Sequence, residues 1–310
     1  MDKQIANTVL LIEPLNFGFN NESAQYNFLQ QQAGLSNQEI SALARTELCC
    51  IAAALRAKGV NVILVQDDEF QKTPSSVFVA SWISFHEDSR IVAYPIACEN
   101  RKSERRGDIL SIIVDNDFPV YDIVDISTYE NEGKFLHGTE SVVFDRVNKV
   151  AYTAISPVSD ASVFSELSSK YGYFPISFSA ALDHEGERRP VFSTNLVLSI
   201  ADRYAIVCLE SISNREEREF VRKVLVDGGK RIVEITEEQA LKFVGSAIQL
   251  QKVNGGKLLL MSEGAYTALS GVQIETLRSF NEILTVDIPT MEQVGGASIG
   301  SVVASVFLPK

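Results

Sequence analysis

Residues 36–65 read SNQEISALARTELCCIAAALRAKGVNVILV, and this stretch predicts the helix-then-strand unit on which the fold is built. Ser36 and Glu39 form the pattern of a capping box, in which each side chain satisfies a free N–H group at the start of a helix. Apolar residues follow at three- and four-residue spacing as far as Leu55, and Gly59 marks the end of the helix. The run NVILV then predicts a buried strand.

The same unit recurs along the chain, and each later helix is preceded by a pair of strands. The expected helices cover residues 102–113, 160–170, 214–227 and 272–281, and a last strand is expected at Ser301–Leu308. About five passes through strand pair, helix and strand occur without a Gly-, Pro- or Ser-rich linker. We therefore expect one domain over residues 1–310, of α/β class with mixed sheets and built by internal repetition.

Composition excludes several classes of function. Of 310 residues, 28 are Lys or Arg and 40 are Asp or Glu, so the net charge of −12 argues against a nucleic-acid partner. No apolar run approaches the ~18 residues of a membrane span, so no membrane partner is expected. The four cysteines are too few for a disulfide scaffold and are expected to be reduced and buried, which favours a cytoplasmic protein: Cys49, Cys50, Cys98 and Cys208.

Common cofactor and metal motifs are absent from the sequence. No G-x-G-x-x-G follows a strand, and no G-x-x-x-x-G-K-[ST] occurs, so neither a dinucleotide nor a P-loop nucleotide is expected as cofactor. The histidines His86, His137 and His184 have no second ligand at metal-binding spacing, so no metal is expected. His184 lies in a polar stretch that predicts a solvated loop.

Clusters of polar and aromatic residues recur in a fixed order from residue 8 to the last few residues. They are NFGFN at 16–20, Thr73-Pro74 with Trp82, His86 and Asp88, Tyr94-Pro95, Asn100-Arg101 with Glu104-Arg105-Arg106, Leu136–Ser141 (LHGTES), Pro190–Asn195 (PVFSTN) and Gly295–Ser301 (GGASIGS).

Taken together, these clusters resemble the bacterial citrulline-utilisation hydrolases and their amidinotransferase-like relatives, which belong to the guanidino-group-modifying superfamily. The resemblance implies a pentein fold, a five-fold pseudosymmetric α/β propeller with a central pocket, and a small guanidino or ureido ligand. It also implies a mechanism in which a cysteine thiolate attacks the guanidinium carbon while a histidine, held by a carboxylate, moves protons.

The three catalytic positions implied by the resemblance have been substituted in this sequence. Ser301 stands at the position of the nucleophilic cysteine, Ser193 at that of the histidine and His137 at that of the carboxylate. A serine nucleophile needs an adjacent base, and the histidine that would act as one is itself a serine. No catalytic residue is therefore intact, and we expect an inactive homologue retained for ligand binding or regulation, with the three positions near one central axis.

Two alternatives stay open at this point. His137 could act as the base for Ser301 in a rewired hydrolase or amidinotransferase, or the chain could be a structural partner of an active relative. A homo-oligomer is also compatible with the sequence. The resemblance implies that the substrate-binding residues are Trp82, His86, Asp88 and Asn195, although for His86 and Asp88 a structural role is the stronger expectation. Arg101, Glu104 and Arg105 are expected to form ion pairs.

Overall fold

The computed structural model describes residues 3–68 and 70–310, and it contains the predicted helix and strand near the start of the chain. Helix α1 (Asn37–Ala57) begins at the expected capping box, where the Glu39 N–H donates to Ser36 Oγ at 3.3 Å and the Ser36 N–H donates to Glu39 Oε2 at 2.9 Å. Its buried face covers strand β1 (Thr8–Glu13), which runs parallel to β2 (Asn61–Gln66).

The described residues form five three-stranded sheets and one two-stranded hairpin. In every three-stranded sheet the middle strand has one antiparallel and one parallel neighbour. The sheets are β17 (Ala304–Ser305) with β1 and β2; β3 (Ile83–Phe85), β4 (Arg90–Ala93) and β5 (Asp122–Asp125); β6 (Val143–Asp145), β7 (Val150–Ala154) and β8 (Phe174–Phe178); β11 (Leu198–Ile200), β12 (Tyr204–Val207) and β13 (Arg231–Glu234); and β14 (Ile248–Gln251), β15 (Lys257–Ser262) and β16 (Glu282–Val286).

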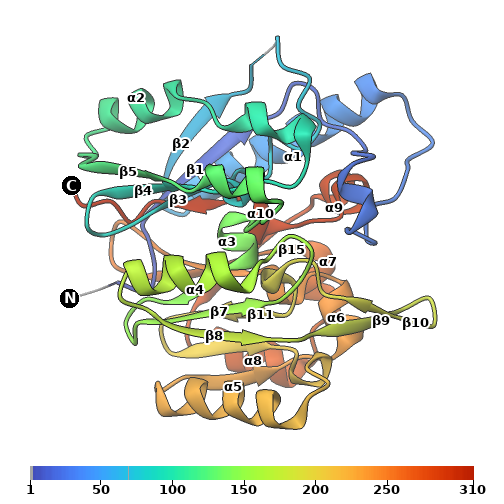
Figure 1. The fold of residues 1–310 in the computed structure, drawn as a ribbon, viewed down its shortest axis with the longest axis vertical. Helices are drawn as coiled ribbons and strands as arrows, with labels where there is room; N and C mark the ends of the chain where they lie inside the picture. Colours follow the sequence, from blue (N-terminus) through green and yellow to red (C-terminus); the bar gives the residue numbers. More distant parts are fainter. Residues whose placement is uncertain (1–2, 69) are drawn as a thin grey trace.

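A helical crossover joins the two parallel strands of each sheet, as parallel pairing requires. The crossover helices are α1, α2 (Asp108–Asp115), α4 (Ala161–Lys170), α5 (Arg215–Asp227) and the pair α7 (Glu263–Ala268) and α8 (Gly271–Arg278). In Figure 1, α1 and α2 lie at one end of the view and α5 and α8 at the other. Within the described residues, no helix combines the length and the apolar character that crossing a membrane requires.

A short helical turn precedes the antiparallel edge strand of each sheet. These turns are η2 (Val79–Ser81), α3 (Gly138–Ser141), η5 (Thr194–Leu196), η7 (Val244–Ser246) and α10 (Ile299–Val302). Each contacts the next in that order, and α10 contacts η2 in turn. Figure 1 shows α3 and α10 in the middle of the molecule, between the outer helices. Segments that are far apart in the sequence therefore meet at these five turns.

The remaining elements connect the units. They are η1 (Ser23–Gln25), η3 (Glu99–Glu104), η4 (Ser127–Glu132), the hairpin of β9 (Ala181–His184) and β10 (Glu187–Pro190), η6 (Leu209–Ser211), α6 (Glu237–Leu241) and α9 (Pro289–Gly295).

The strand expected at Ser301–Leu308 was wrong in its first half. Val302 and Val303 donate their N–H groups to the carbonyls of Ser298 and Ile299, so this segment closes a helical turn before the short strand β17. A short run of buried β-branched residues has the same composition in a strand and in a buried turn, which is why the pattern misled.

The solvated loop expected around His184 was also wrong, because His184 ends strand β9. Glu185 and Gly186 have φ angles of 56° and 80° and connect β9 to β10. Positive φ at both central residues is typical of the two-residue turn of a tight hairpin.

Two further expectations need correction. The helix expected at 102–113 is divided into η3 and α2, with Gly107 at the N-terminus of α2. Cys49 and Cys50 are exposed on α1, whereas Cys98 and Cys208 are buried as expected. The helical periodicity of α1 places its buried face on Leu48 and Ile51, so their two cysteine neighbours point outward.

We expect Gly138→Ala to lower the free energy of unfolding by about 3 kcal/mol, because overpacking at a site that cannot relax is strongly destabilising. Gly138 has φ +39°, and a Cβ there would lie 2.1 Å from the carbonyl oxygen of Ala80. Denaturant titration measures the change. The control is Gly34→Ala, whose Cβ would meet nothing within 4 Å. Equal stability of the two variants would contradict the close packing of α3 against η2.

Candidate functional site

A cavity of about 30 Å³ lies against four of the short turns, α3, η5, η7 and α10. His137, Ser193 and Ser301, which are separated by more than fifty residues from one another in the sequence, all line it. His137 and Ser193 are the residues that directly precede α3 and η5, and Ser301 lies within α10. The structure thus brings these three residues together. Asn195 also lines the cavity, and so does Glu140, to which the sequence analysis assigned no role.

A buried guanidinium stands beside this cavity. Arg101 is 4% exposed and donates to both carboxylate oxygens of Glu104 at 3.0–3.1 Å. It also donates to Ser81 Oγ at 2.9 Å, which fixes η2. Burial acts to lower the pKa of Arg101, but the charges of Glu104 and Glu140 outweigh it and raise that pKa above its usual value. The predicted Arg101–Glu104 ion pair is confirmed.

Arg105 also forms an ion pair, as expected, but with Glu130, a partner that the sequence analysis had not named; its Nη2 lies 3.1 Å from Glu130 Oε2. Both residues are partly buried, and Glu130 also accepts the N–H of Ile96 at 2.7 Å. This pair therefore holds the backbone between β4 and η3, outside the cavity.

Glu140 is the acidic group of the cavity. Burial raises the pKa of its carboxyl, while the charge of Arg101 and the hydroxyls of Ser301 and Ser81 act in the opposite direction. Glu140 follows His137 by three residues, one turn of helix α3, which brings both side chains to the same side. The sequence signal was present in the motif LHGTES, where an acid appears one helical turn after the histidine.

The ring of His137 is held in one tautomer. Its Nε2 accepts the N–H of Ala97 at 3.1 Å, so in the neutral ring the proton resides on Nδ1. Nδ1 lies 4.0 Å from Glu140 Oε2. Burial lowers the pKa of His137 to about 3, and the charge of Arg101 adds to this effect. His137 is therefore a neutral ring at physiological pH, and its lone pair is already engaged.

Ser193 and Ser301 meet through Asn195. The Ser193 hydroxyl donates to Asn195 Oδ1 at 2.7 Å and lies 3.1 Å from the carbonyl of Glu140. Asn195 Nδ2 donates to Ser301 Oγ at 3.4 Å. The hydrogen bond of the His137 ring goes to the N–H of Ala97, and among the described residues none joins the ring to Ser193 or Ser301.

The other sequence-based candidates lie away from this cavity. Trp82 is buried in a hydrophobic cluster with the neighbouring strands. His86 stacks on Tyr171 with ring centroids 4.4 Å apart and contacts Ser84 Oγ at 2.9 Å. Asp88 pairs with Arg90 near the surface. Of the four residues, the structure brings only Asn195 to the lining.

Thiols do not line the cavity. The nearest candidate, Cys98, lies behind Tyr26, whose Oη is 3.2 Å from its Sγ. Burial raises the pKa of Cys98 and raises that of Cys208 to about 12, so both thiols stay protonated. Among the described residues, no group of three His, Cys, Asp or Glu side chains is arranged to hold a metal ion.

Comparison with known families places this geometry in context. The model of the family N,N dimethylarginine dimethylhydrolase, eukaryotic, matches residues 13–308. No curated protein matches the chain.

Solved structures share the fold at low identity. The N-terminal domain of ArgZ, an arginine dihydrolase from cyanobacteria crystallised with its substrate, is 13% identical, with a TM-score of 0.67 over 97% of this chain and 99% of that domain. AgrE, solved with ornithine and NAD+, is 12% identical with a TM-score of 0.71. A dimethylarginine dimethylaminohydrolase adduct is 15% identical, with a TM-score of 0.62 over 97% and 99% of the two chains.

The chain spans only part of the longer relatives. It covers 41% of the whole ArgZ chain, with a TM-score of 0.69, and 39% of AgrE. The likeness therefore concerns the fold of that part of these longer chains.

We expect the imidazole of His137 to stay neutral from pH 8 to pH 4.5, so its NMR ring shifts should be constant over that range. An unfolded histidine has a pKa of about 6.5, so below that pH the unfolded chain binds a proton that folded His137 does not. Stability is therefore lost as the pH falls from 6.5 towards 3. This single group should contribute a loss of about 2 kcal/mol between pH 7 and pH 5.

The variant His137→Gln keeps an acceptor for the Ala97 N–H and removes the titrating ring. Its unfolding free energy should fall less steeply between pH 7 and pH 5 than that of the unmodified protein. A ring shift of His137 that titrates near pH 6, or an unchanged slope in the variant, would contradict the assignment.

Proposed function

Because the chain belongs to the family of eukaryotic-type N,N dimethylarginine dimethylhydrolases, within the guanidino-modifying pentein superfamily, we propose that it is a catalytically inactive member. In this proposal it retains the domain fold and the acidic cavity for binding or regulation and does not break a C–N bond. The finer resemblance to citrulline-utilisation hydrolases is part of the same proposal. So is the assignment of Ser301, Ser193 and His137 to the three catalytic positions.

The observation that carries the proposal is the environment of Ser301. Guanidinium carbon is a poor electrophile and needs a nucleophile that is largely deprotonated at neutral pH. The Ser301 hydroxyl accepts from the Asn195 amide at 3.4 Å, and it acts to lower the pKa of the neighbouring Glu140 carboxyl. Burial that raises the pKa of Glu140 does not create a base strong enough to take a proton from an alcohol. A hydroxyl without such a base remains protonated.

The alternative, a Ser301–His137 dyad, finds no support in this geometry. A general base needs a free lone pair directed at the hydroxyl and a pKa near the working pH. The lone pair on Nε2 of His137 is occupied by the N–H of Ala97, and the pKa of the ring is about 3. Nδ1 carries the proton and faces Glu140.

The proposed ligand is a small guanidino or ureido group. Such a group presents planar N–H donors, which suit the carboxyl of Glu140 and the amide oxygen of Asn195. The cavity of about 30 Å³ is far smaller than the ~300 Å³ of a typical small-molecule site, so in this conformation it accommodates a small head group and not a whole amino acid.

We also infer that the five units form one pseudosymmetric propeller, as a single domain over residues 1–310. Two observations support this arrangement. The five sheets repeat the same strand order and crossover, and the five short turns contact one another in sequence order and from the last back to the first.

We expect the purified protein to release no ammonia or alkylamine from arginine, citrulline, agmatine or N,N-dimethylarginine above the uncatalysed rate. Ser301→Cys alone should not restore turnover, since no free histidine would protonate the leaving group. The smallest set with a prospect of activity is Ser301→Cys with Ser193→His and His137→Glu. Colorimetric assay of ammonia and chromatography of the amine follow the reaction.

The inactive reading would be overturned if the unmodified protein turned over any of these substrates and Ser301→Ala abolished that turnover. Circular dichroism of each variant establishes that it is folded, so that a missing activity reports on chemistry.

A further inference from the structure

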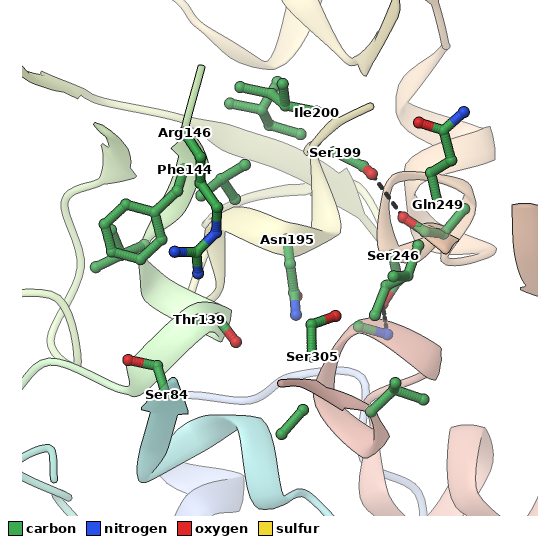
Figure 2. Close-up of a pocket in the computed structure, with 18 of the residues that line it drawn as sticks. Ser84, Thr139, Phe144, Arg146, Asn195, Ser199, Ile200, Ser246, Gln249 and Ser305 are labelled. Atoms are coloured by element: carbon green, nitrogen blue, oxygen red, sulfur yellow. Dashed lines mark hydrogen bonds between the residues drawn. The ribbon is translucent and has the colours of Figure 1, made fainter. Parts of the chain in front are cut away.

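A second, larger cavity of about 130 Å³ lies across a thin partition from the first. Asn195 and Ser246 line both cavities and form this partition. The Ser246 hydroxyl accepts the N–H of Gly300 at 3.0 Å, which ties two of the short turns together there. The edge strands β3, β6, β11, β14 and β17 all contribute to the walls, one from each three-stranded sheet (Figure 2).

One charged side chain lines this second cavity. Arg146 directly follows β6 and is 6% exposed. Figure 2 shows its guanidinium extending into the space that Thr139 and Asn195 border. Its backbone N–H donates to Gln4 Oε1 at 2.8 Å, and the Gln4 amide donates to the carbonyls of Phe144 and Ile200. These hydrogen bonds therefore fix the backbone from which the Arg146 side chain extends.

The guanidinium of Arg146 has no carboxylate within 4 Å among residues 3–68 and 70–310. It stacks over the ring of Phe307, 3.7 Å from the centroid, and lies 5.1 Å from that of Phe144. Burial lowers the pKa of Arg146, and the neighbouring Tyr173 hydroxyl and Glu87 carboxylate act in the opposite direction. Arg101 on the other side of the partition is equally buried but is fully paired with Glu104.

A largely buried guanidinium that has no ion-pair partner is costly, and its preferred partner is a carboxylate or phosphate that accepts two parallel hydrogen bonds. None of the other side chains that line this cavity is charged. Its walls are apolar at Ile83, Val142, Leu198 and Val303. The hydroxyl of Thr139 also lines the cavity and makes no hydrogen bond within residues 3–68 and 70–310, so it is free to donate.

We propose that this second cavity binds a short-chain monocarboxylate, whose carboxylate pairs with Arg146 and Thr139 and whose aliphatic chain packs against the apolar walls. A single positive charge balances a single negative one. A phosphate dianion would leave one charge uncompensated in a site of low polarity, so the geometry favours a monocarboxylate. Entry is through the partly exposed residues Ile200, Ser305 and Phe307. The site is independent of the proposed inactivity of the first cavity.

The test is titration of the full chain with butyrate, followed by calorimetry and by ¹H–¹⁵N NMR. Butyrate should bind and shift the amide signals of Thr139, Ser199 and Gln249. Butyramide, which has the same shape and no charge, should bind at least tenfold more weakly, and inorganic phosphate should bind more weakly than butyrate.

Two variants test separately the charge of Arg146 and the access to the cavity. Arg146→Met should reduce butyrate affinity at least tenfold without lowering the melting temperature, since it removes an unpaired buried charge. Ser305→Leu should reduce affinity by blocking the entrance while Arg146 stays in place, and it keeps the test valid if Arg146→Met fails to fold. Arg189→Met, on the exposed hairpin, is the matched control and should bind as the unmodified protein does.

Any of four results would overturn the proposal. These are no binding of butyrate at tens of millimolar, equal binding of butyrate and butyramide, tighter binding of phosphate, or unchanged affinity in both Arg146→Met and Ser305→Leu.

Discussion

The guanidinium of Arg101 is shielded from water and donates to both oxygens of Glu104, to the Ser81 hydroxyl and to the carbonyl of Phe78. Because an arginine does not lose its proton in a protein, these partners have to be in place for the chain to fold. They fix η2 against η3, and η2 in turn contacts α3, which carries Glu140. The buried charge of Arg101 thus determines the position of Glu140, the acidic residue of the cavity.

The same charge governs the chemistry nearby. It lowers the pKa of His137 in addition to the effect of burial, and it opposes the rise in the pKa of Glu140 that burial causes. A neutral imidazole and a buried acid beside a protonated hydroxyl are suited to hydrogen bonding. The proposed inactivity rests on these groups, because attack on a guanidinium carbon requires a thiolate and a proton-transferring histidine. Across the partition, Arg146 has no ion-pair partner within 4 Å among the described residues, whereas Arg101 is paired with Glu104.

Much of the fold could be predicted from the sequence because it rests on local signals. The capping box at Ser36, the periodic face of α1 and the repeated helix–strand units depend on neighbours close in the chain. The turn at α10 could not be predicted, because the buried valines 302 and 303 suit a strand equally well and only packing against the other turns decides. The hairpin at His184 depends on positive φ angles, which a polar stretch does not disclose.

The candidate site was predictable in part. The resemblance of motifs pointed to positions 137, 193 and 301, and the structure gathers these residues around one cavity. The partner of His137 was not predictable, since the N–H of Ala97 reaches it from a loop forty residues away. Neither was the lack of an ion pair to Arg146 within the part of the chain that the structure describes, because it is a property of the folded arrangement and not of any sequence pattern.

The central claim is that Ser301 does not act as a nucleophile, and the most direct measurement is rapid-quench mass spectrometry of the intact protein. The protein is mixed with arginine, citrulline or N,N-dimethylarginine, quenched in acid at intervals from milliseconds to minutes, and digested to recover the peptide that contains Ser301. The account predicts an unchanged mass at every time point. A transient adduct of the substrate's central carbon on Ser301 would contradict it.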